Sequence, residues 1–284
     1  MGWAAIRSAT LGLAGAALLF SPQGEANAKP QRIMSLKICT DELLMDLVPP
    51  SRIASITYLS REKAALKLWP EAAHIPVNHN SPEEVLKVRP DLILTDNFTP
   101  PTMRSLLLKS GAPLLEVSVA ENFAEIPGAL RRVGRAVGEE ARAEALIADM
   151  FAKIRQLQAS EPKLRIRVVS WGGGGYVPGR EGLFNAVLEL AGGIDIARTD
   201  SYYDVESLIA ARPQIIAYGD DYLDSPSLRQ DQNDHPVLLK FFKNRRVVYP
   251  AAAAYNCGLP QSVDAAQALR AAMLAAMAKP GGVK

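Results

Sequence analysis

The sequence lacks an excess of charge of either sign. Its 32 lysines and arginines are matched by 30 aspartates and glutamates, which leaves a formal net charge of +2 over 284 residues. A protein that binds nucleic acid needs a basic face to neutralise phosphates, so this balance argues against a nucleic-acid partner. Long apolar runs are also lacking beyond the N-terminus, and a bilayer span needs about 20 such residues. We therefore expect most of the chain to be soluble.

The N-terminus carries a short apolar run at residues 9–20, ATLGLAGAALLF. Arg7 precedes it, and Ala26-Asn27-Ala28 follows with the small residues that signal peptidase accepts. A membrane anchor is the alternative, but 12 residues are too few for a span. No cysteine stands at the cleavage site to carry a lipid. The pattern predicts a signal peptide at 1–28, cleavage after Ala28, and a periplasmic protein.

Cysteine is nearly absent, since only Cys39 and Cys257 occur. An oxidising compartment permits them to pair. Three interpretations stay open: a disulfide that ties two parts of the fold, two thiols that contact a ligand or a metal, or two small buried residues. The sequence does not supply the Cα separation that would decide between them.

Residues with catalytic or metal-binding chemistry are also few. The three histidines are His74, His79 and His235, too few for a bare zinc or manganese site. The serine-hydrolase pattern G-x-S-x-G is missing. The glycine run 172–175 is followed by Tyr-Val-Pro rather than by the Lys-Ser/Thr of a phosphate loop. We expect no catalytic residues, no metal site and no resident cofactor. Two functional hypotheses stay open at this point. One is an exported enzyme that uses Asp96, Asp220 or Asp221, and the other is a sensor without transport function.

One unit occurs twice, 123 residues apart. Residues 81–96 read SPEEVLKVRPDLILTD, and residues 204–220 read DVESLIAARPQIIAYGD. Each has a glutamate in the first turn of a predicted helix, a proline seven residues later and then an apolar strand. Glu83 therefore matches Glu206, and Pro90 matches Pro213. The duplication indicates two similar halves.

Strands and helices alternate on both sides of a helical stretch. This order predicts an α/β fold with two Rossmann-like lobes and mostly parallel sheets, the N-terminal lobe at 29–121 and the C-terminal lobe at 163–284. The connector is 122–162, where two helical runs meet at Gly138. The second, 139–158, has apolar residues at helical spacing and a length of about 30 Å. We further expect a helix to start near Glu42, with Thr40 and Asp41 as caps.

Four motifs carry a family resemblance: RIMSL at 32–36, PEEVLKVRPDLIL at 82–94, VESLIAARPQII at 205–216 and GLPQSVDA at 258–265. With the lobe–helix–lobe order, they resemble the periplasmic substrate-binding proteins that serve ABC importers of vitamin B12, ferric siderophores and haem. The resemblance implies capture of a metal chelate by a monomer, without catalysis, and delivery to a permease in the inner membrane. It also implies that Glu83 and Glu206 dock onto basic sockets of that permease. The alternative is that both are ordinary acids of a helix N-terminus.

Ligands of two-lobed α/β proteins bind outside the carboxyl ends of the strands. Aromatic residues are 6% of the chain, yet many fall in these loops, where tyrosine suits a large, partly polar ligand. The predicted ligand-binding residues are Cys39, Thr40, Tyr58, His79, Asn97, Trp171, Tyr176, Tyr203, Tyr255, Asn256 and Cys257. Tyr58, Tyr203 and Tyr255 are the candidates for a haem ligand, and Arg180 and Arg229 for a siderophore. The family's B12 binder lines its cleft with tryptophans, whereas only Trp171 lies near this one.

Overall fold

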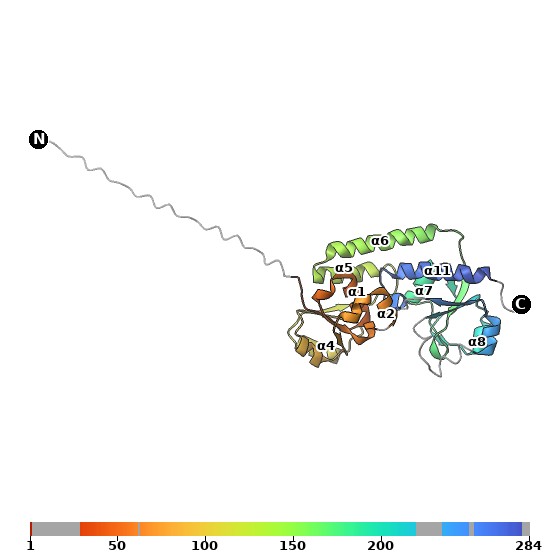
Figure 1. The fold of residues 1–284 in the computed structure, drawn as a ribbon, viewed down its shortest axis with the longest axis horizontal. Coiled ribbons are helices and arrows are strands. Elements are labelled where there is room, and N and C mark those ends of the chain that lie inside the picture. Colours follow the sequence, from red (N-terminus) through yellow and green to blue (C-terminus); the bar gives the residue numbers. More distant parts are fainter. Residues whose placement is uncertain (2–28, 62, 220–234, 250–252, 280–284) are drawn as a thin grey trace.

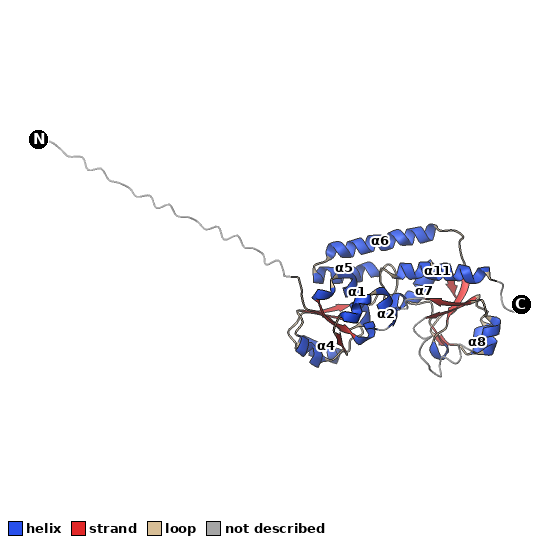
Figure 2. Cartoon of the chain, viewed as in Figure 1, coloured by secondary structure: helices blue, strands red, loops and turns tan. Residues whose placement is uncertain are grey.

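The structure is a computed structural model, which describes Met1 and residues 29–61, 63–219, 235–249 and 253–279. The segment predicted as a signal peptide therefore lies almost entirely outside the described residues. Two lobes lie side by side, and helix α6 (Glu140–Ala159) runs along one side of both (Figure 1). Helices flank the sheets in each lobe (Figure 2).

The N-terminal lobe is built on a five-stranded parallel sheet. Its strands are β1 (Ile33–Ser35), β2 (Ile53–Thr57), β3 (Val77–Asn78), β4 (Leu92–Asp96) and β5 (Leu114–Val117), in the order β3-β2-β1-β4-β5. Its helices are α1 (Ile38–Leu47), α2 (Lys63–Leu68), α3 (Pro82–Val88) and α4 (Pro101–Leu108). Successive side chains of β4 enter opposite cores, because Leu92 and Leu94 pack in one cluster and Ile93 in another. A strand buried on both faces explains its continuous apolar run.

The C-terminal lobe repeats this plan with a four-stranded parallel sheet. Its strands are β6 (Ile166–Ser170), β8 (Gly193–Asp195), β10 (Ile215–Gly219) and β11 (Arg246–Tyr249), in the order β11-β10-β6-β8. A short antiparallel pair joins β7 (Tyr176–Val177) to β9 (Ser201–Tyr202). The helices are α7 (Leu183–Leu190), α8 (Val205–Ala210), α9 (Pro236–Phe241), α10 (Ala253–Asn256) and α11 (Ser262–Ala278). The predicted two-lobed α/β fold is confirmed.

The connector consists of α5 (Ile126–Val137) and α6, which meet at Gly138 with φ 70°. That left-handed conformation suits glycine, as expected for the end of a helix. The predicted apolar stripe of α6 is buried and reaches both lobes. Ala143, Ile147, Met150 and Ile154 pack in the N-terminal core, and Leu157 packs in the C-terminal core.

The chain also returns to the N-terminal lobe near its end, which the sequence did not predict. Leu259 and Val263 belong to the N-terminal hydrophobic core. Gly258 packs so closely on Ala120 that a Cβ at this position would lie 2.5 Å from the Ala120 Cβ. Residues 257–263 therefore pack as part of the N-terminal lobe, although they follow the C-terminal sheet.

Helix α1 begins earlier than predicted. It starts at Ile38 rather than near Glu42, with Lys37 as the N-cap. Thr40 is a helical residue whose hydroxyl donates to the Lys37 carbonyl at 2.9 Å, and Asp41 turns inward to three donors of the core. The prediction of Thr40 and Asp41 as caps was wrong because their polar groups are engaged by buried partners rather than by free helical N–H groups.

Candidate ligand-binding site

The duplicated sequence unit has the same backbone geometry in both lobes. Ser81 caps α3 by accepting from Glu84 N–H, and Asp204 caps α8 by accepting from Ser207 N–H. Both helices are followed by an arginine with positive φ, 51° at Arg89 and 50° at Arg212, directly before the proline. A proline disfavours the right-handed helical conformation in the residue before it, so both helices end before this arginine.

Glu83 and Glu206 occupy the second position of these two helices, and both side chains are exposed. The pKa of Glu83 is lowered by its own backbone N–H and by the Ser81 hydroxyl. A carboxylate is favoured at a helix N-terminus because the free N–H groups there carry partial positive charge. The fold therefore presents one exposed glutamate side chain per lobe at equivalent places.

In the N-terminal lobe, an aromatic pair stands at the carboxyl ends of β2 and β3. The rings of Tyr58 and His79 stack with centroids 5.2 Å apart and an interplanar angle of 22°. Glu84 holds the histidine, since its Oε1 lies 3.2 Å from His79 Nδ1 and its Oε2 accepts from His79 N–H at 2.8 Å. Partial burial opposes the charge of Glu84, but the hydrogen bonds from His79 and Ser81 outweigh it and lower the pKa of this carboxyl. Tyr58 remains 50% exposed and accessible to a ligand.

In the C-terminal lobe, a second aromatic group surrounds the glycine run. The rings of Tyr176 and Tyr202 lie 5.7 Å apart, and the Tyr176 hydroxyl donates to Asp200 Oδ2 at 3.0 Å. Gly179 N–H donates to the other carboxylate oxygen of Asp200 at 2.9 Å. Burial, together with the nearby Asp200 carboxylate, raises the pKa of Tyr176. These contacts hold the phenol neutral and oriented.

The glycine run 172–175 makes a turn in the backbone. Gly174 and Gly175 have φ of 72° and 81°, a conformation that other residues rarely adopt. The turn places Tyr203, whose N–H donates to Gly175 O at 2.8 Å. The turn at 172–175 therefore fixes the position of the Tyr203 backbone.

The two predicted asparagines lie at the surface. Asn97 follows β4, and its Oδ1 accepts from Val119 N–H at 3.1 Å. Asn256 ends α10 and is exposed. Phe98, next to Asn97, is 66% exposed and adds an apolar surface to the same turn.

Four of the predicted ligand contacts lie in the interior. Thr40, Trp171, Tyr255 and Cys257 are at most 4% exposed. Trp171 donates from Nε1 to Tyr203 O, and the Tyr255 hydroxyl donates to Ala265 O. The side chains of these four residues are covered by the protein itself in this conformation. Sequence position alone placed them in loops, whereas tertiary packing buries them.

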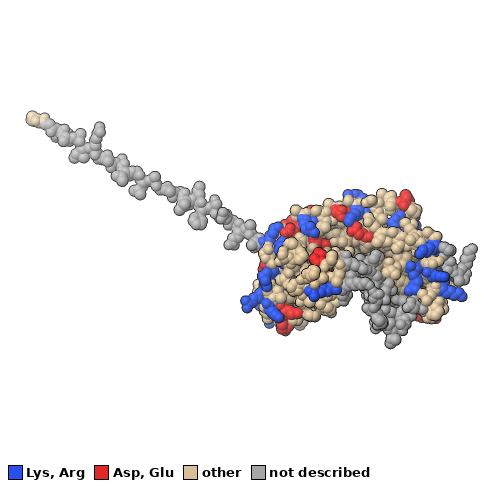
Figure 3. All heavy atoms as spheres, in the orientation of Figure 1, with Lys and Arg blue, Asp and Glu red and all other residues tan. Residues whose placement is uncertain are grey.

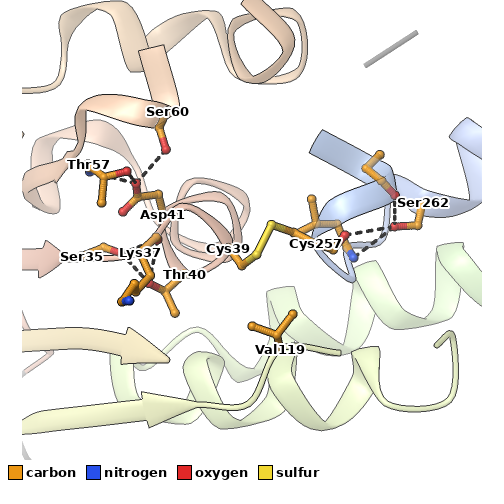
Figure 4. The surroundings of a disulfide bond; sticks show 12 residues. Ser35, Lys37, Cys39, Thr40, Asp41, Thr57, Ser60, Val119, Cys257 and Ser262 are labelled. Carbon is orange, nitrogen blue, oxygen red and sulfur yellow. Dashed lines mark hydrogen bonds between the residues drawn. A yellow bond between two sulfur atoms is a disulfide. The ribbon is translucent and has the colours of Figure 1, made fainter. Parts of the chain in front are cut away.

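Cys39 and Cys257 form a disulfide, which decides between the three interpretations. Their Cα atoms lie 5.2 Å apart, although 218 positions separate them in the chain. The bond joins the first turn of α1 to the segment before α11, where Cys257 lies beside Ser262 (Figure 4). The bond therefore fastens the segment before α11, which packs with the N-terminal lobe, to α1.

The burial of three carboxyl groups in α1 was not predicted from the sequence. Asp41, Glu42 and Asp46 lie within α1 and are at most 5% exposed. Burial raises the pKa of Asp41 to about 6 and that of Asp46 to about 6, against the opposing hydrogen bonds each accepts. Burial, together with the neighbouring acids Asp41 and Asp46, raises the pKa of Glu42 well above its ordinary value. The only sequence signal was three acids inside an apolar run, which equally fits an amphipathic helix.

Some earlier candidates cannot be placed. Asp220, Asp221 and Arg229 lie outside the described residues. Arg180 is described, and its Nε donates to Asp195 O at 3.1 Å.

On the face drawn in Figure 3, basic and acidic side chains both occur on the N-terminal lobe and along the α6 side. In the described part of the chain, no helix combines the length and apolar character needed to cross a bilayer.

Comparison with known proteins identifies the family. Residues 47–252 match the periplasmic binding protein family, so the chain belongs to it. Two cobalamin-binding proteins of Halobacterium salinarum are 22% identical over 202 residues, which is 68% of this chain. The chain matches 55% of their length, so it spans about half of these relatives.

Solved structures agree with the fold. A periplasmic haem-binding protein from Pseudomonas aeruginosa superposes with a TM-score of 0.70 at 22% identity, covering 90% of this chain and 96% of that one. The vitamin B12-binding protein of Vibrio cholerae gives 0.66 at 16% identity, covering 88% and 99%. The haem-binding protein RhuT from Roseiflexus sp. RS-1 gives 0.71 at 21% identity, covering 87% and 98%. At these identities the likeness establishes the fold of the two lobes.

Proposed function

We propose that this protein captures a metal chelate in the periplasm and delivers it to an ABC importer. The observation that carries the proposal is the duplicated glutamate helix, one in each lobe of a periplasmic binding protein. Two exposed carboxylates held apart by a folded connector form a two-point docking surface. The chelate class is a ferric siderophore, a corrinoid or haem, since related proteins are described as binding haem or cobalamin.

The accessible aromatic groups would contact the chelate from both lobes. Tyr58 and His79 supply a stacked pair in the N-terminal lobe, and Tyr176 and Tyr203 supply phenol groups in the C-terminal lobe. Flat rings with one polar edge suit a ligand that is large and only partly polar. Asn97 and Asn256 would add hydrogen bonds at the surface. Cys39 and Cys257 would hold α1 and the segment before α11 together through their disulfide, and would not contact the chelate.

Delivery would proceed without catalysis. The chelate would bind with a small hinge motion, because α6 packs along both lobes and the disulfide fastens the segment before α11 to the N-terminal lobe. The loaded protein, a monomer without a nucleic-acid partner, would dock through Glu83 and Glu206 onto arginines of the permease. Exposed charges of this kind steer association more than they add affinity. Residues 1–28 would direct export and be removed after Ala28.

Native mass spectrometry of the protein purified from its own periplasm tests capture. The expected result is the mass of the mature chain plus one chelate, with no turnover of that chelate on incubation. Conversion of the bound compound into a product would support the competing hypothesis of an exported enzyme. A protein that stays empty and shows no stabilisation with siderophores, corrinoids or haem would contradict the proposal.

A further inference from the structure

Glu42 is a buried carboxyl group that the fold leaves without a hydrogen bond. Its side chain is 0% exposed, and neither carboxylate oxygen has a hydrogen-bond partner among the described residues. Polar groups in protein interiors are normally paired, because burying one without a partner costs several kcal/mol. Neither capture nor docking uses this group.

The carboxyl group of Glu42 faces the disulfide. One of its oxygens and the sulfurs of Cys39 and Cys257 all lie within 4.8 Å of one another. Cys39 and Glu42 are three residues apart in α1, which places them on one face of the helix. Cys257 approaches the same point from the far end of the chain.

The neighbouring acids are occupied elsewhere. Asp41 Oδ2 accepts from Thr57 and Ser60, and Asp46 Oδ1 accepts from Trp69 and Gln261. Glu42 alone of the three acids in α1 has both carboxylate oxygens unpartnered within the described part of the chain. A cation at this point would satisfy Glu42 and offset the negative potential of the other two acids.

We propose that Cys39, Cys257 and Glu42 form a binding site for a zinc-like divalent cation when the disulfide is reduced. Two thiolates and one carboxylate oxygen are ligands that zinc prefers. Ligand atoms of a tetrahedral zinc site lie about 3.4–3.8 Å apart. The two sulfurs must therefore move apart once their bond is broken, and the Glu42 oxygen must close on them by no more than about 1.4 Å. A dithiol reductant supplies two electrons and two protons, and becomes a disulfide itself. Each cysteine thiol then loses its proton on binding the metal.

This site would exchange the covalent link between α1 and the segment before α11 for a coordinate one. The metal would join α1 to the segment before α11 at the same place as the sulfur–sulfur bond. The reduced protein would then keep the segment before α11 fastened to α1 as long as the cation is bound. Removal of the cation would leave only non-covalent contacts to hold that segment on the N-terminal lobe.

Metal titration of the full mature chain tests the site. The disulfide is reduced with a water-soluble phosphine, which takes oxygen from water to become a phosphine oxide and is then removed. We expect the reduced protein to bind one more Zn²⁺ per chain than the oxidised protein, which serves as the baseline for other sites. Co²⁺ in place of Zn²⁺ should give thiolate-to-metal charge-transfer absorption. The Cys39→Ser/Cys257→Ser variant should show neither effect.

Glu42→Gln tests the third ligand, because it keeps the shape and removes the anionic oxygen. We expect at least a tenfold loss of Zn²⁺ affinity in the reduced form. X-ray absorption of the reduced wild-type protein with zinc needs no variant and should show two sulfur neighbours with oxygen. The proposal is overturned by no additional zinc in the reduced protein, by loss of its native circular dichroism on reduction, by unchanged affinity in Glu42→Gln, or by a zinc shell without sulfur.

Discussion

Gln261 donates a hydrogen bond from Nε2 to Oδ1 of Asp46 at 2.7 Å, across 215 positions of the sequence. The same oxygen accepts from Trp69 Nε1 at 2.9 Å, and Arg142 of α6 donates to the Asp46 backbone carbonyl. Asp46 thus joins the N-terminal lobe, the connector and the end of the chain. This junction lies at the opposite end of α1 from the disulfide, and Gln261 follows Cys257 by four residues.

Gln261→Ala should destabilise the protein by about 1–2 kcal/mol, because it removes one hydrogen bond from a buried carboxyl group. Urea unfolding of the oxidised protein measures the change as a lower midpoint. Gln267→Ala is the control on the same helix, away from Asp46, and should change stability by less than about 0.5 kcal/mol. Equal effects of the two changes would show that the bond to Asp46 contributes nothing.

Reduction of the disulfide should lower the free energy of unfolding by about 5 kcal/mol on the chain-entropy model, since the bond closes a loop of more than 200 residues. The comparison is urea unfolding with and without reductant in metal-free buffer. The Cys39→Ser/Cys257→Ser variant should unfold at the same midpoint in both. An unchanged wild-type midpoint on full reduction would mean that non-covalent contacts alone hold the end of the chain.

Gly258→Ala should cost about 1–3 kcal/mol, because the new Cβ would lie 2.5 Å from Ala120 Cβ and 2.6 Å from Ala120 O. Gly128→Ala is the matched control within α5, where a Cβ meets nothing within 4 Å. That change should stabilise the protein by about 0.5–1 kcal/mol through helix propensity. Thermal unfolding of both variants checks the pair, and a neutral Gly258→Ala would contradict the tight contact between residues 258 and 120.

Asp41→Asn should remove part of the pH dependence of stability. The pKa of Asp41 is about 6 in the folded protein against an ordinary 3.8, so the folded state binds this proton more tightly than the unfolded state. The free energy of unfolding therefore falls as pH rises from about 4 to about 6, by about 3 kcal/mol for this group. The variant lacks this contribution. Its urea midpoint should therefore change less between pH 4.5 and pH 7 than the midpoint of the wild-type protein.

Asp149→Asn provides the matched control for that comparison. Asp149 is an exposed acid of α6, and its carboxylate pairs only with Lys153 in the described part of the chain. This change should leave the difference between the two pH values almost as in wild type. Parallel profiles for Asp41→Asn and wild type would show that the buried carboxyl titrates in the usual range.

The double change Glu83→Ala with Glu206→Ala should reduce chelate uptake by cells at least tenfold while the affinity of the purified protein for its chelate stays the same. The proposed docking uses one carboxylate on each lobe, whereas the proposed ligand contacts lie in other segments. Glu140→Ala is the control, since Glu140 is an exposed acid in the first turn of α6. Normal uptake by the double variant would rule out docking through these glutamates.

Features that depend on neighbours in the chain were determined by the sequence alone. The capping box of Ser81 and Glu84, the glycine break at 138, the apolar stripe of α6 and the duplicated glutamate helices all follow from spacing along one segment. Helices and strands repeat every 3.6 and every two residues, so their faces can be read locally. The alternation of elements then indicated two parallel α/β lobes.

Only the tertiary structure decided which distant groups meet. The sulfurs of Cys39 and Cys257, the amide of Gln261 with Asp46, and the ring of Tyr58 with His79 are brought together by the packing of separate elements. The burial of Trp171, Tyr255 and Glu42 could not be predicted from the sequence. The residues next to them in the chain do not indicate which other elements will pack over them. Local spacing sets the direction in which a side chain leaves the backbone, while the surrounding lobes determine what it contacts.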